Sequence, residues 1–239
     1  MNIVLVGYGK MGKLIAQTIA DSDDMRVIGI VDVDQLRSFD EIDAKADVVM
    51  DFSYPGNLNM TLDYVTKTKC ALVLGSTGFT AEQMEAVYAA AKLAPIVYSA
   101  NYSLGIAVLK KALSIVSPAL RDSFDIEIVE AHHRQKADSP SGTAKLLKEA
   151  IDPEGEFASK EGRSGIIGAR PKKEIGMHAV RGGTVTGDHT VMFLGDQEML
   201  EFKHSASSRQ IFVNGAIRAA RFAAGRKPGL YTIDDVLFT

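Results

Sequence analysis

Cysteine, net charge and long apolar runs are all scarce in this sequence of 239 residues. A single cysteine, Cys70, cannot form an internal disulfide or a cysteine-based zinc site, which favours a reducing compartment. The formal net charge of −3 gives no global argument for binding nucleic acid or an anionic membrane. No apolar run approaches the ~18 residues that a transmembrane helix needs, and strand-like sequence from Asn2 leaves no room for a signal peptide. We therefore expect a cytoplasmic protein.

The sequence does have the composition of an ordinary globular protein, with 46% hydrophobic and 24% charged residues. In its first part, short branched apolar runs alternate with helical patterns. The apolar runs span residues 2–6, 26–31, 48–52, 71–74 and 96–98, and helical spacing is clearest at 13–20 and 80–92. Thr80 and Gln83 have the spacing of a capping box. This alternation predicts a doubly wound α/β domain with a Rossmann-like parallel sheet.

The pattern changes after Asn101. Residues 104–120 have the spacing of one long amphipathic helix that stops near Pro118, and residues 124–131 alternate strictly, as in a strand with one wet face. A helix at 143–151, a mobile surface loop at 153–173, and strands at 174–181, 185–194 and 198–205 follow. Strands without intervening helices predict an α+β domain with a mixed or antiparallel sheet.

These patterns divide the chain into two domains. We expect a dinucleotide-binding domain formed by residues 1–103 plus 214–239, and a substrate-binding and oligomerisation domain at 104–213. The helix predicted at 214–224 would return to pack on the first domain.

A Gly-x-Gly-x-x-Gly pattern follows the first predicted strand and opens the first helix. Gly7 allows a tight turn, Gly9 lets the backbone approach a pyrophosphate, and Gly12 lets the helix pack on the strand. The N–H groups at the helix start would bind the diphosphate, and Asp32, at the end of the second strand, would bind the adenosine ribose. Tight packing without a ligand is the alternative. The contacts predicted in this loop are Gly7, Tyr8, Gly9, Lys10, Met11 and Gly12.

Two further loops follow later strands of the same domain. Because ligands of open α/β sheets bind beyond the carboxyl ends of the strands, both loops are placed to contact ribose or nicotinamide. Ordinary turns are the alternative, and Phe52 either flanks a cofactor ring or belongs to the core. The predicted contacts are Phe52, Gly75, Ser76, Thr77, Ser99, Ala100, Asn101 and Tyr102.

The densest group of chemically active residues lies at 131–143, directly after the alternating strand. Two histidines, an arginine and a lysine are followed by Ser141, Gly142 and Thr143, which open a helix. Free N–H groups and hydroxyls at a helix start form an anion site, which nearby cations reinforce. The combination predicts a small substrate with one or more carboxylates, and a histidine that serves as a general acid near neutral pH. A solvated basic turn is the alternative.

The remaining histidines carry less weight in the prediction. No third and fourth ligand stands at useful spacing for zinc, so we expect no metal site. Packing or interface roles are expected for His178, Arg181, His189, His204 and Arg209, although the first three could face the substrate. Cys70 is expected to be inert core.

The segment from Glu130 to Thr143 resembles the signature of the dihydrodipicolinate reductase family, also called 4-hydroxy-tetrahydrodipicolinate reductases. The resemblance extends over nearly the whole chain, through residues 7–12, 75–78, 99–105 and 204–236. It implies an enzyme that transfers hydride from NADH or NADPH to a cyclic dicarboxylate imine, giving tetrahydrodipicolinate on the diaminopimelate route to lysine. It also implies a homotetramer built through the sheet of the second domain, and a hinge that closes the cofactor domain over the substrate.

The same resemblance implies roles for individual residues. His132 would be the general acid that protonates the ring carbon after hydride arrives. Lys136 would bind a carboxylate and assist as a proton donor or charge stabiliser. The other residues implied to hold the substrate carboxylates are His133, Ser141, Gly142 and Thr143.

The chain departs from the family pattern after the second strand and in the segment from Glu130 to Thr143. Val33 follows Asp32 where many members have an arginine for the 2′-phosphate of NADPH, so a strong NADPH preference is not expected, although Lys10 could compensate. Gln135 replaces a histidine, with little expected effect. Two other functions stay open: a different two-domain dehydrogenase acting on an amino acid or aldehyde, and a nucleotide-sensing binding protein that needs no general acid.

Overall fold

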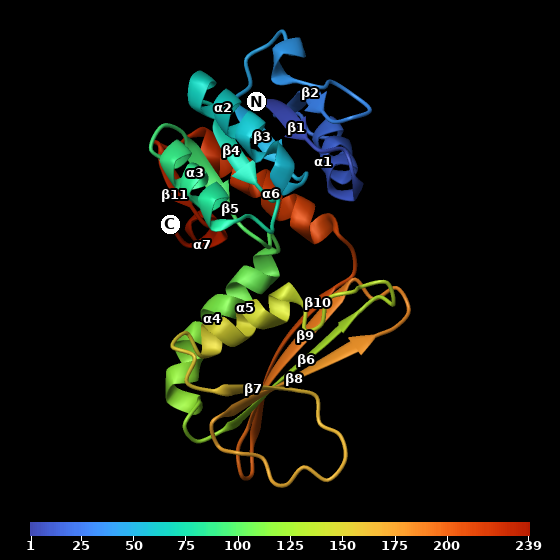
Figure 1. Cartoon of the computed structure of the whole chain (residues 1–239), viewed down its shortest axis with the longest axis vertical. Coiled ribbons are helices and arrows are strands. Elements are labelled where there is room, and N and C mark those ends of the chain that lie inside the picture. The colour runs from blue at the N-terminus through green and yellow to red at the C-terminus, as the bar shows by residue number, and fades with distance from the viewer. The chain divides into compact units, whose positions relative to one another are not determined.

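The computed structural model describes all 239 residues, which form two compact units. One unit combines Met1–Leu104 with Gln210–Thr239, and the other is Gly105–Arg209 (Figure 1). Each unit has its own sheet and its own hydrophobic core. No helix in the chain combines the length and the apolar character that crossing a membrane requires.

The first unit contains a six-stranded parallel sheet in the order β11-β5-β4-β3-β1-β2. Its strands are β1 (Asn2–Val6), β2 (Arg26–Val31), β3 (Val48–Asp51), β4 (Ala71–Leu74), β5 (Pro95–Tyr98) and β11 (Gly229–Tyr231). Every residue of β3 and β4 is buried, as expected for strands that helices cover on both faces. The predicted Rossmann-like sheet is confirmed, and β11 adds an edge strand that the sequence patterns did not predict.

Helices flank this sheet. They are α1 (Lys10–Ala20), α2 (Leu58–Thr68), α3 (Ala81–Ala91), α6 (Gln210–Ala224) and α7 (Ile233–Phe238), with 3₁₀ turns at Phe39–Glu41 and Pro55–Asn57. The capping box of α3 is confirmed, since Gln83 N–H donates to Thr80 Oγ1 at 3.2 Å and Thr80 N–H donates to Gln83 Oε1 at 3.0 Å. Helix α6 starts earlier than predicted and contacts β3, β4 and β5, as expected for a returning helix.

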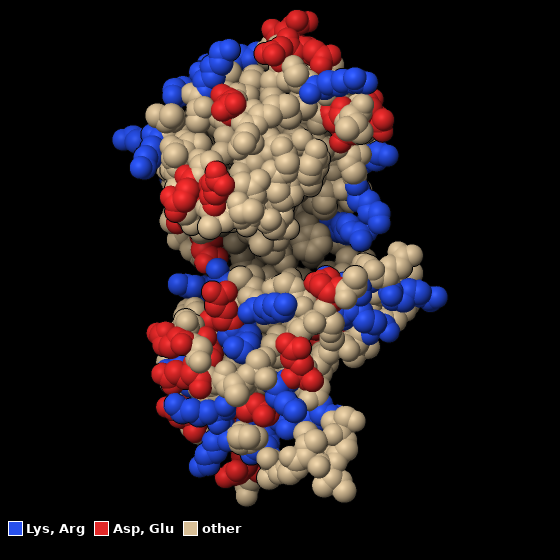
Figure 2. Space-filling model, viewed as in Figure 1, with Lys and Arg blue, Asp and Glu red and all other residues tan.

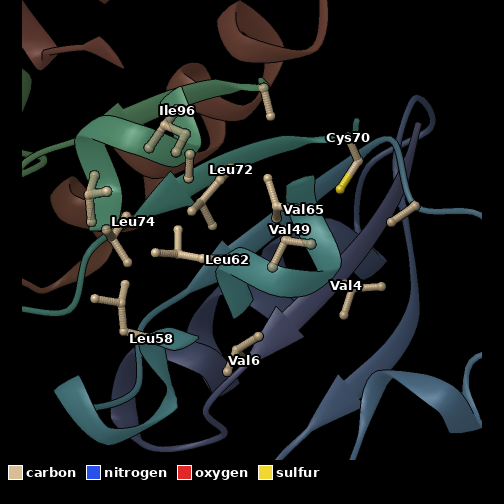
Figure 3. Close-up of a cluster of buried hydrophobic side chains, with 14 of the residues drawn as sticks. Val4, Val6, Val49, Leu58, Leu62, Val65, Cys70, Leu72, Leu74 and Ile96 are labelled. Carbon is tan, nitrogen blue, oxygen red and sulfur yellow. The ribbon is translucent and has the colours of Figure 1, made fainter. Parts of the chain in front are cut away.

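The core of the first unit joins the parallel strands to α2. Figure 3 shows side chains from both converging on one another, and the labelled residues are Val4, Val6, Val49, Leu58, Leu62, Val65, Cys70, Leu72, Leu74 and Ile96. Cys70 lies inside this cluster, where burial raises the pKa of its thiol. It behaves as a small apolar side chain, as predicted.

The second unit contains a five-stranded mixed sheet in the order β10-β9-β6-β8-β7. The strands are β6 (Asp125–His132), β7 (Ala158–Glu161), β8 (Glu174–Arg181), β9 (Gly187–Leu194) and β10 (Met199–Ala206), and the helices are α4 (Leu104–Leu120) and α5 (Gly142–Ile151). Strand β6 runs parallel to β8 and antiparallel to β9, so the predicted mixed sheet is confirmed. Helix α4 has the bounds predicted from the sequence and contains Pro118 in its last turn.

Helices cover one face of this sheet, and the other, uncovered face carries no helix. Alternate residues of β6, such as Ile126 and Ile128, are fully buried against Leu113 of α4 and Leu147 of α5. The residues between them, such as Glu127 and Val129, are only half-buried. The strict alternation predicted for this strand therefore reflects a sheet with helices on one face only.

The segment predicted as a loop at 153–173 needs correction, because it contains the edge strand β7, parallel to β8. Arginines fasten the rest of this segment to the uncovered face of the sheet. The Arg170 guanidinium donates to Glu127 Oε1 at 3.0 Å and to Asp125 Oδ1 at 2.7 Å, and Arg163 pairs with Glu174. On the face drawn in Figure 2, acidic and basic side chains are interspersed over this unit.

Candidate active site

The glycine-rich turn between β1 and α1 has the geometry that a close backbone approach requires. Gly7 has a φ of +90°, and a Cβ there would lie 2.9 Å from the carbonyl oxygen of Phe52. A Cβ on Gly12 would lie only 2.1 Å from the carbonyl oxygen of Gly7. Gly9, the N-cap of α1, has open space around its Cβ position and makes no side-chain capping bond. The first N–H groups of α1 are therefore available to an anion.

Asp32 lies directly beside this turn, at the end of β2. Its Oδ2 accepts a hydrogen bond from Tyr8 N–H at 2.7 Å. Gly7 N–H donates to Val31 O at 2.9 Å, which joins the turn to the same strand. The side chain of Val33 is 81% exposed, so the residue after the acid presents an apolar group to solvent. Lys10 is also exposed, at the first position of α1.

The residues after β3 and β4 form the next part of this edge. The Phe52 ring covers Gly75, where a Cβ would lie 2.2 Å from a ring carbon. Ser76 is buried and its hydroxyl donates to Asp51 Oδ1 at 2.8 Å, whereas Thr77 is exposed. Because the strands are parallel, these loops and the glycine turn share one edge of the sheet, as predicted.

The loop after β5 holds itself in shape. The Ser99 hydroxyl donates to Asn101 O at 2.7 Å, and Asn101 Oδ1 accepts from Ser103 N–H at 2.8 Å, while Ala100 is exposed. Tyr102 is 3% exposed, and its hydroxyl lies 3.0 Å from the carbonyl oxygens of both Leu74 and Val97. Its side chain therefore supports the loop from the interior, and only its backbone is left for the predicted cofactor contact.

In the second unit, the end of β6 carries a buried acid–imidazole pair. Nδ1 of His132 lies 2.5 Å from Oε2 of Glu130. Glu130 also accepts two hydrogen bonds from the Arg181 guanidinium, at 2.7 and 2.8 Å, and one from Ser141 N–H at 3.1 Å. A carboxylate with these donors holds the proton of His132 on Nδ1, which leaves Nε2 as the atom facing outward from the pair.

The charge on Glu130 is set by competing effects. Burial by itself raises the pKa of a carboxyl group, but the hydrogen bonds from Arg181 and then His132 outweigh it and hold the pKa of Glu130 below its ordinary value. Glu130 is therefore ionised at neutral pH, and its Oε2 accepts the hydrogen bond from His132 Nδ1–H.

His189, on β9, lies against this pair from the neighbouring strand. The rings of His132 and His189 are 5.1 Å apart between centroids, and Nε2 of His189 is 3.1 Å from the hydroxyl of Ser141. Burial, and then the charge of His132, lower the pKa of His189 to about 4. Its Nδ1 is buried without a hydrogen-bond partner. His189 is therefore uncharged at neutral pH.

The start of α5 lies next to the same group. Ser141 is its N-cap, with a hydroxyl that accepts from Ala144 N–H at 3.1 Å. Gly142 is exposed with open space around its Cβ position, and Thr143 is half-buried. The exposed backbone of Gly142 therefore stands at a helix N-terminus, where an anion can bind.

Lys136 and His133 lie in the turn between β6 and α5. The ammonium of Lys136 is 2.8 Å from Asp138 Oδ1, and Lys136 N–H donates to His133 O at 3.1 Å. Hydrogen bonding from Lys136 lowers the pKa of Asp138. The ring of His133 has a buried Nδ1 without a hydrogen-bond partner. Nowhere does the chain gather three or more side chains that could hold a metal ion.

Sequence reasoning missed the partners of His132. Glu130 stands two positions before His132 on an alternating strand, so the shared face could have been predicted from spacing. Arg181 and His189 were assigned to packing, and their positions beside the acid depend on the register of β6 with β8 and β9. Nothing in the local sequence specifies that register.

A parallel sheet that presents a glycine-rich helix start at its carboxyl edge is the architecture of nucleotide-dependent oxidoreductases, and the fold and site place the chain in that class. Comparison with known families identifies it further. Residues 1–102 match the model for "Dihydrodipicolinate reductase, N-terminus", and residues 105–237 match that for "Dihydrodipicolinate reductase, C-terminus". The chain belongs to the dihydrodipicolinate reductase family, and the resemblance drawn from its sequence is confirmed.

Individual relatives agree with this assignment. The 4-hydroxy-tetrahydrodipicolinate reductase of Brachyspira hyodysenteriae is 41% identical over 99% of this chain and 100% of its own length. The reductase of the same name from Akkermansia muciniphila is 43% identical over 99% of this chain and 98% of its own. A dipicolinate-bound dihydrodipicolinate reductase from Paenisporosarcina sp. TG-14 has the same fold, with a TM-score of 0.80 at 22% identity over 100% and 99% of the two chains.

Proposed function

We propose that this chain is a 4-hydroxy-tetrahydrodipicolinate reductase. The 4-hydroxyl of the cyclic dicarboxylate imine leaves as water, and the unsaturated imine that remains takes up a hydride and a proton and gives tetrahydrodipicolinate for diaminopimelate and lysine synthesis. The observation that carries the proposal is the Glu130–His132 pair beside the open first turn of α5. It combines a proton donor with an anion site in a chain whose full-length relatives bear this name.

The residues at the carboxyl edge of the first unit fit a nicotinamide dinucleotide. Gly9 leaves the first N–H groups of α1 open for a diphosphate, and Asp32, already bonded to Tyr8 N–H through Oδ2, keeps Oδ1 for a ribose hydroxyl. The bound cofactor supplies the hydride. We propose that either NADH or NADPH serves, because exposed Val33 offers no cation to a 2′-phosphate while Lys10, exposed at the first position of α1, could supply one.

Residues of the turn before α5 and of the start of α5 would bind the carboxylates of the substrate. The N–H groups of Gly142 and Thr143 and the N-cap Ser141 would bind one carboxylate of the substrate. Lys136 would leave its ion pair with Asp138 and bind a substrate carboxylate instead. The ring of His133 would also contact a substrate carboxylate. These groups fit a small dicarboxylate, and a bound dipicolinate is named in the Paenisporosarcina relative.

His132 would act as the general acid. Its Nδ1–H would stay hydrogen-bonded to Glu130. Its Nε2 would deliver a proton to a carbon of the substrate ring after hydride transfer. Glu130 stabilises the protonated imidazole before the transfer, and Lys136 would offset negative charge that develops on the substrate. Because His189 is held neutral, it does not compete with His132 for the proton.

We also propose a role for each of the two domains. The cofactor would bind to residues 1–103 plus 214–239, and residues 104–213 would bind substrate and mediate assembly into a homotetramer in the cytoplasm. The uncovered face of the second sheet supports the assembly, because Val180 and Met199 on it are 53% and 55% exposed. They pair in register with Ala131 and Leu194. Sedimentation of Val180→Asp should show smaller particles than the unchanged chain.

The experiment that tests the reaction follows nicotinamide absorbance during coupled turnover. Freshly enzyme-generated 4-hydroxy-tetrahydrodipicolinate is mixed with the protein and either NADH or NADPH in separate cuvettes. We expect oxidation of the cofactor, a loss of about 10²-fold or more in Lys136→Ala and His132→Gln, and little change in Lys145→Ala, an exposed lysine on α5.

Two other outcomes would each carry a clear meaning. If neither cofactor is oxidised although both bind tightly, the reductase assignment is wrong and a nucleotide-sensing binding protein becomes the better explanation. If turnover persists in Lys136→Ala and His132→Gln, the reaction stands but the assignment of the anion site and the general acid does not.

A further inference from the structure

Asp51, the last residue of β3, is a buried carboxylate. It belongs neither to the glycine pattern at residues 7–12 nor to the segment from Glu130 to Thr143. It is 1% exposed. Its Oδ1 accepts from Ser53 N–H at 3.0 Å, from the Ser53 hydroxyl at 2.7 Å and from the Ser76 hydroxyl at 2.8 Å. Its Oδ2 accepts from the Thr61 hydroxyl at 2.9 Å. All of these donors are neutral groups, and the carboxylate forms no ion pair.

These donors come from three separate parts of the first unit. Ser53 belongs to the turn after β3, Thr61 to helix α2, and Ser76 to the loop after β4. A second bond, from Ser53 N–H to the Ser76 hydroxyl at 3.0 Å, closes the network between the two loops. Hydrogen bonds to a buried carboxylate are stronger than those between neutral groups, so Asp51 holds both loops in one arrangement.

The order of the strands tells which half of a dinucleotide these loops would face. The chain goes from β1 outward to β2 and then returns to β3 on the other side of β1, so the sheet reverses its winding there. A dinucleotide crosses an open sheet at such a point, with its diphosphate on the turn after β1. Asp32 lies on the β2 side, which suits the adenosine ribose. The loops that Asp51 joins lie on the opposite, nicotinamide side.

The same loops carry residues that shape this side of the edge. Phe52 lies between Asp51 and Ser53 in the chain, and its ring covers Gly75, next to Ser76. The Ser53 Cα and Cβ would lie 2.9 Å from a Cβ on Gly7, so this turn also borders the glycine turn. A shift of the turn after β3 would therefore move the Phe52 ring and the lining of the nicotinamide side together.

We propose that Asp51 is a positioning residue for the nicotinamide half of the cofactor. It orders the turn after β3 and the loop after β4 before the cofactor binds, so that binding does not have to fix them. The inference rests on the proposed dinucleotide site and is independent of the substrate assignment.

The test is the affinity of the folded protein for whole and partial cofactors. In Asp51→Asn the side chain keeps its shape but loses its charge, and one acceptor oxygen becomes an N–H₂ group that faces donors. We expect the Kd for NADH and NADPH, measured by nicotinamide fluorescence, to rise on the order of tenfold. The Kd for ADP-ribose, which lacks nicotinamide, should stay within about twofold, as measured by calorimetry, because its contacts lie on the Asp32 side.

The matched control is Asp47→Asn. Asp47 stands just before the other end of the same strand, is exposed, and accepts from Asn2 N–H at 2.7 Å. Its variant should leave the Kd of all three ligands unchanged. If Asp51→Asn does not fold, Thr61→Val removes one donor at similar volume and should show the same selective loss at a smaller size.

The outcomes separate this inference from the proposed function. Equal weakening of ADP-ribose and NADH, or no weakening of either, would overturn the positioning role while the dinucleotide site stands. Failure of the unchanged protein to bind either dinucleotide would overturn the proposed function and this inference with it.

Discussion

Replacement of His189 by glutamine is expected to change how the stability of the second unit depends on pH. The imidazole of His189 is 4% exposed, and its pKa in the folded protein is about 4, against 6.5 for an unperturbed histidine. Burial is the main cause, and the charge of nearby His132 adds to it. Because the folded pKa is the lower one, the unfolded chain takes up a proton first as the pH falls. Stability present above about pH 6.5 is therefore lost progressively towards about pH 4.

The size of this loss follows from the two pKa values. Linkage between a folded pKa of about 4 and an unfolded value of 6.5 gives a loss of about 2 kcal/mol in the free energy of unfolding between about pH 7 and about pH 5. His189→Gln lacks the titrating ring but keeps a group that can bond to the Ser141 hydroxyl. The difference in free energy of unfolding, wild type minus variant, should thus fall by about 2 kcal/mol over that range.

The measurement is denaturant unfolding of both proteins at the two pH values, followed by circular dichroism. Ser141→Ala is the control, because it removes the N-cap bond to Ala144 and the bond to His189 but keeps the imidazole. It should cost ~1 kcal/mol at both pH values. A difference between wild type and His189→Gln that is the same at both pH values, or that grows at the lower one, would refute the reasoning.

Three further predictions concern the glycine turn and the acid beside His132. Gly12→Ala should lower the free energy of unfolding by ~1–3 kcal/mol in denaturant titrations, because its Cβ would lie 2.1 Å from Gly7 O, and an unchanged value would contradict the packing described for that turn. Gly9→Ala, where space is open, should keep its stability and raise the Kd for NADH, and tight binding in that variant would argue against a diphosphate site there. Glu130→Gln should lower kcat at least ~tenfold in the coupled assay and leave the Kd for NADH unchanged, since general acid catalysis typically raises the rate by a factor of ~10²–10⁴. Normal turnover in this variant would show that His132 acts without the carboxylate of Glu130.

The sequence predicted the elements whose local signals are strong. Continuous apolar runs predicted β1, β2 and β4 with the bounds that the structure has, and the Thr80–Gln83 spacing predicted the start of α3. Such signals work because burial on both faces of a parallel strand, or a capping bond three residues along, depends on neighbours in the chain.

Two strands escaped prediction because their pairing depends on distant residues. Strand β7, with the sequence Ala-Ser-Lys-Glu, is mostly exposed and has no apolar pattern. It exists because β8 offers backbone partners, and β11 likewise exists because β5 does. An edge strand needs hydrogen bonds from one neighbour only, and that neighbour is supplied by the fold.

The candidate site likewise depends partly on local sequence and partly on contacts between distant residues. The sequence by itself determined the glycine turn, Asp32, the turn with His133 and Lys136, and the start of α5. Each is a single residue or a contiguous segment whose chemistry follows from its residue types. Only the tertiary structure decided which carboxylates support them: strand register brings Arg181 and His189 to Glu130, and sheet order brings Ser76 and Thr61 to Asp51. A buried charge is stabilised by donors wherever they come from in the chain, so its partners are specified by the packing of whole elements rather than by spacing along the sequence.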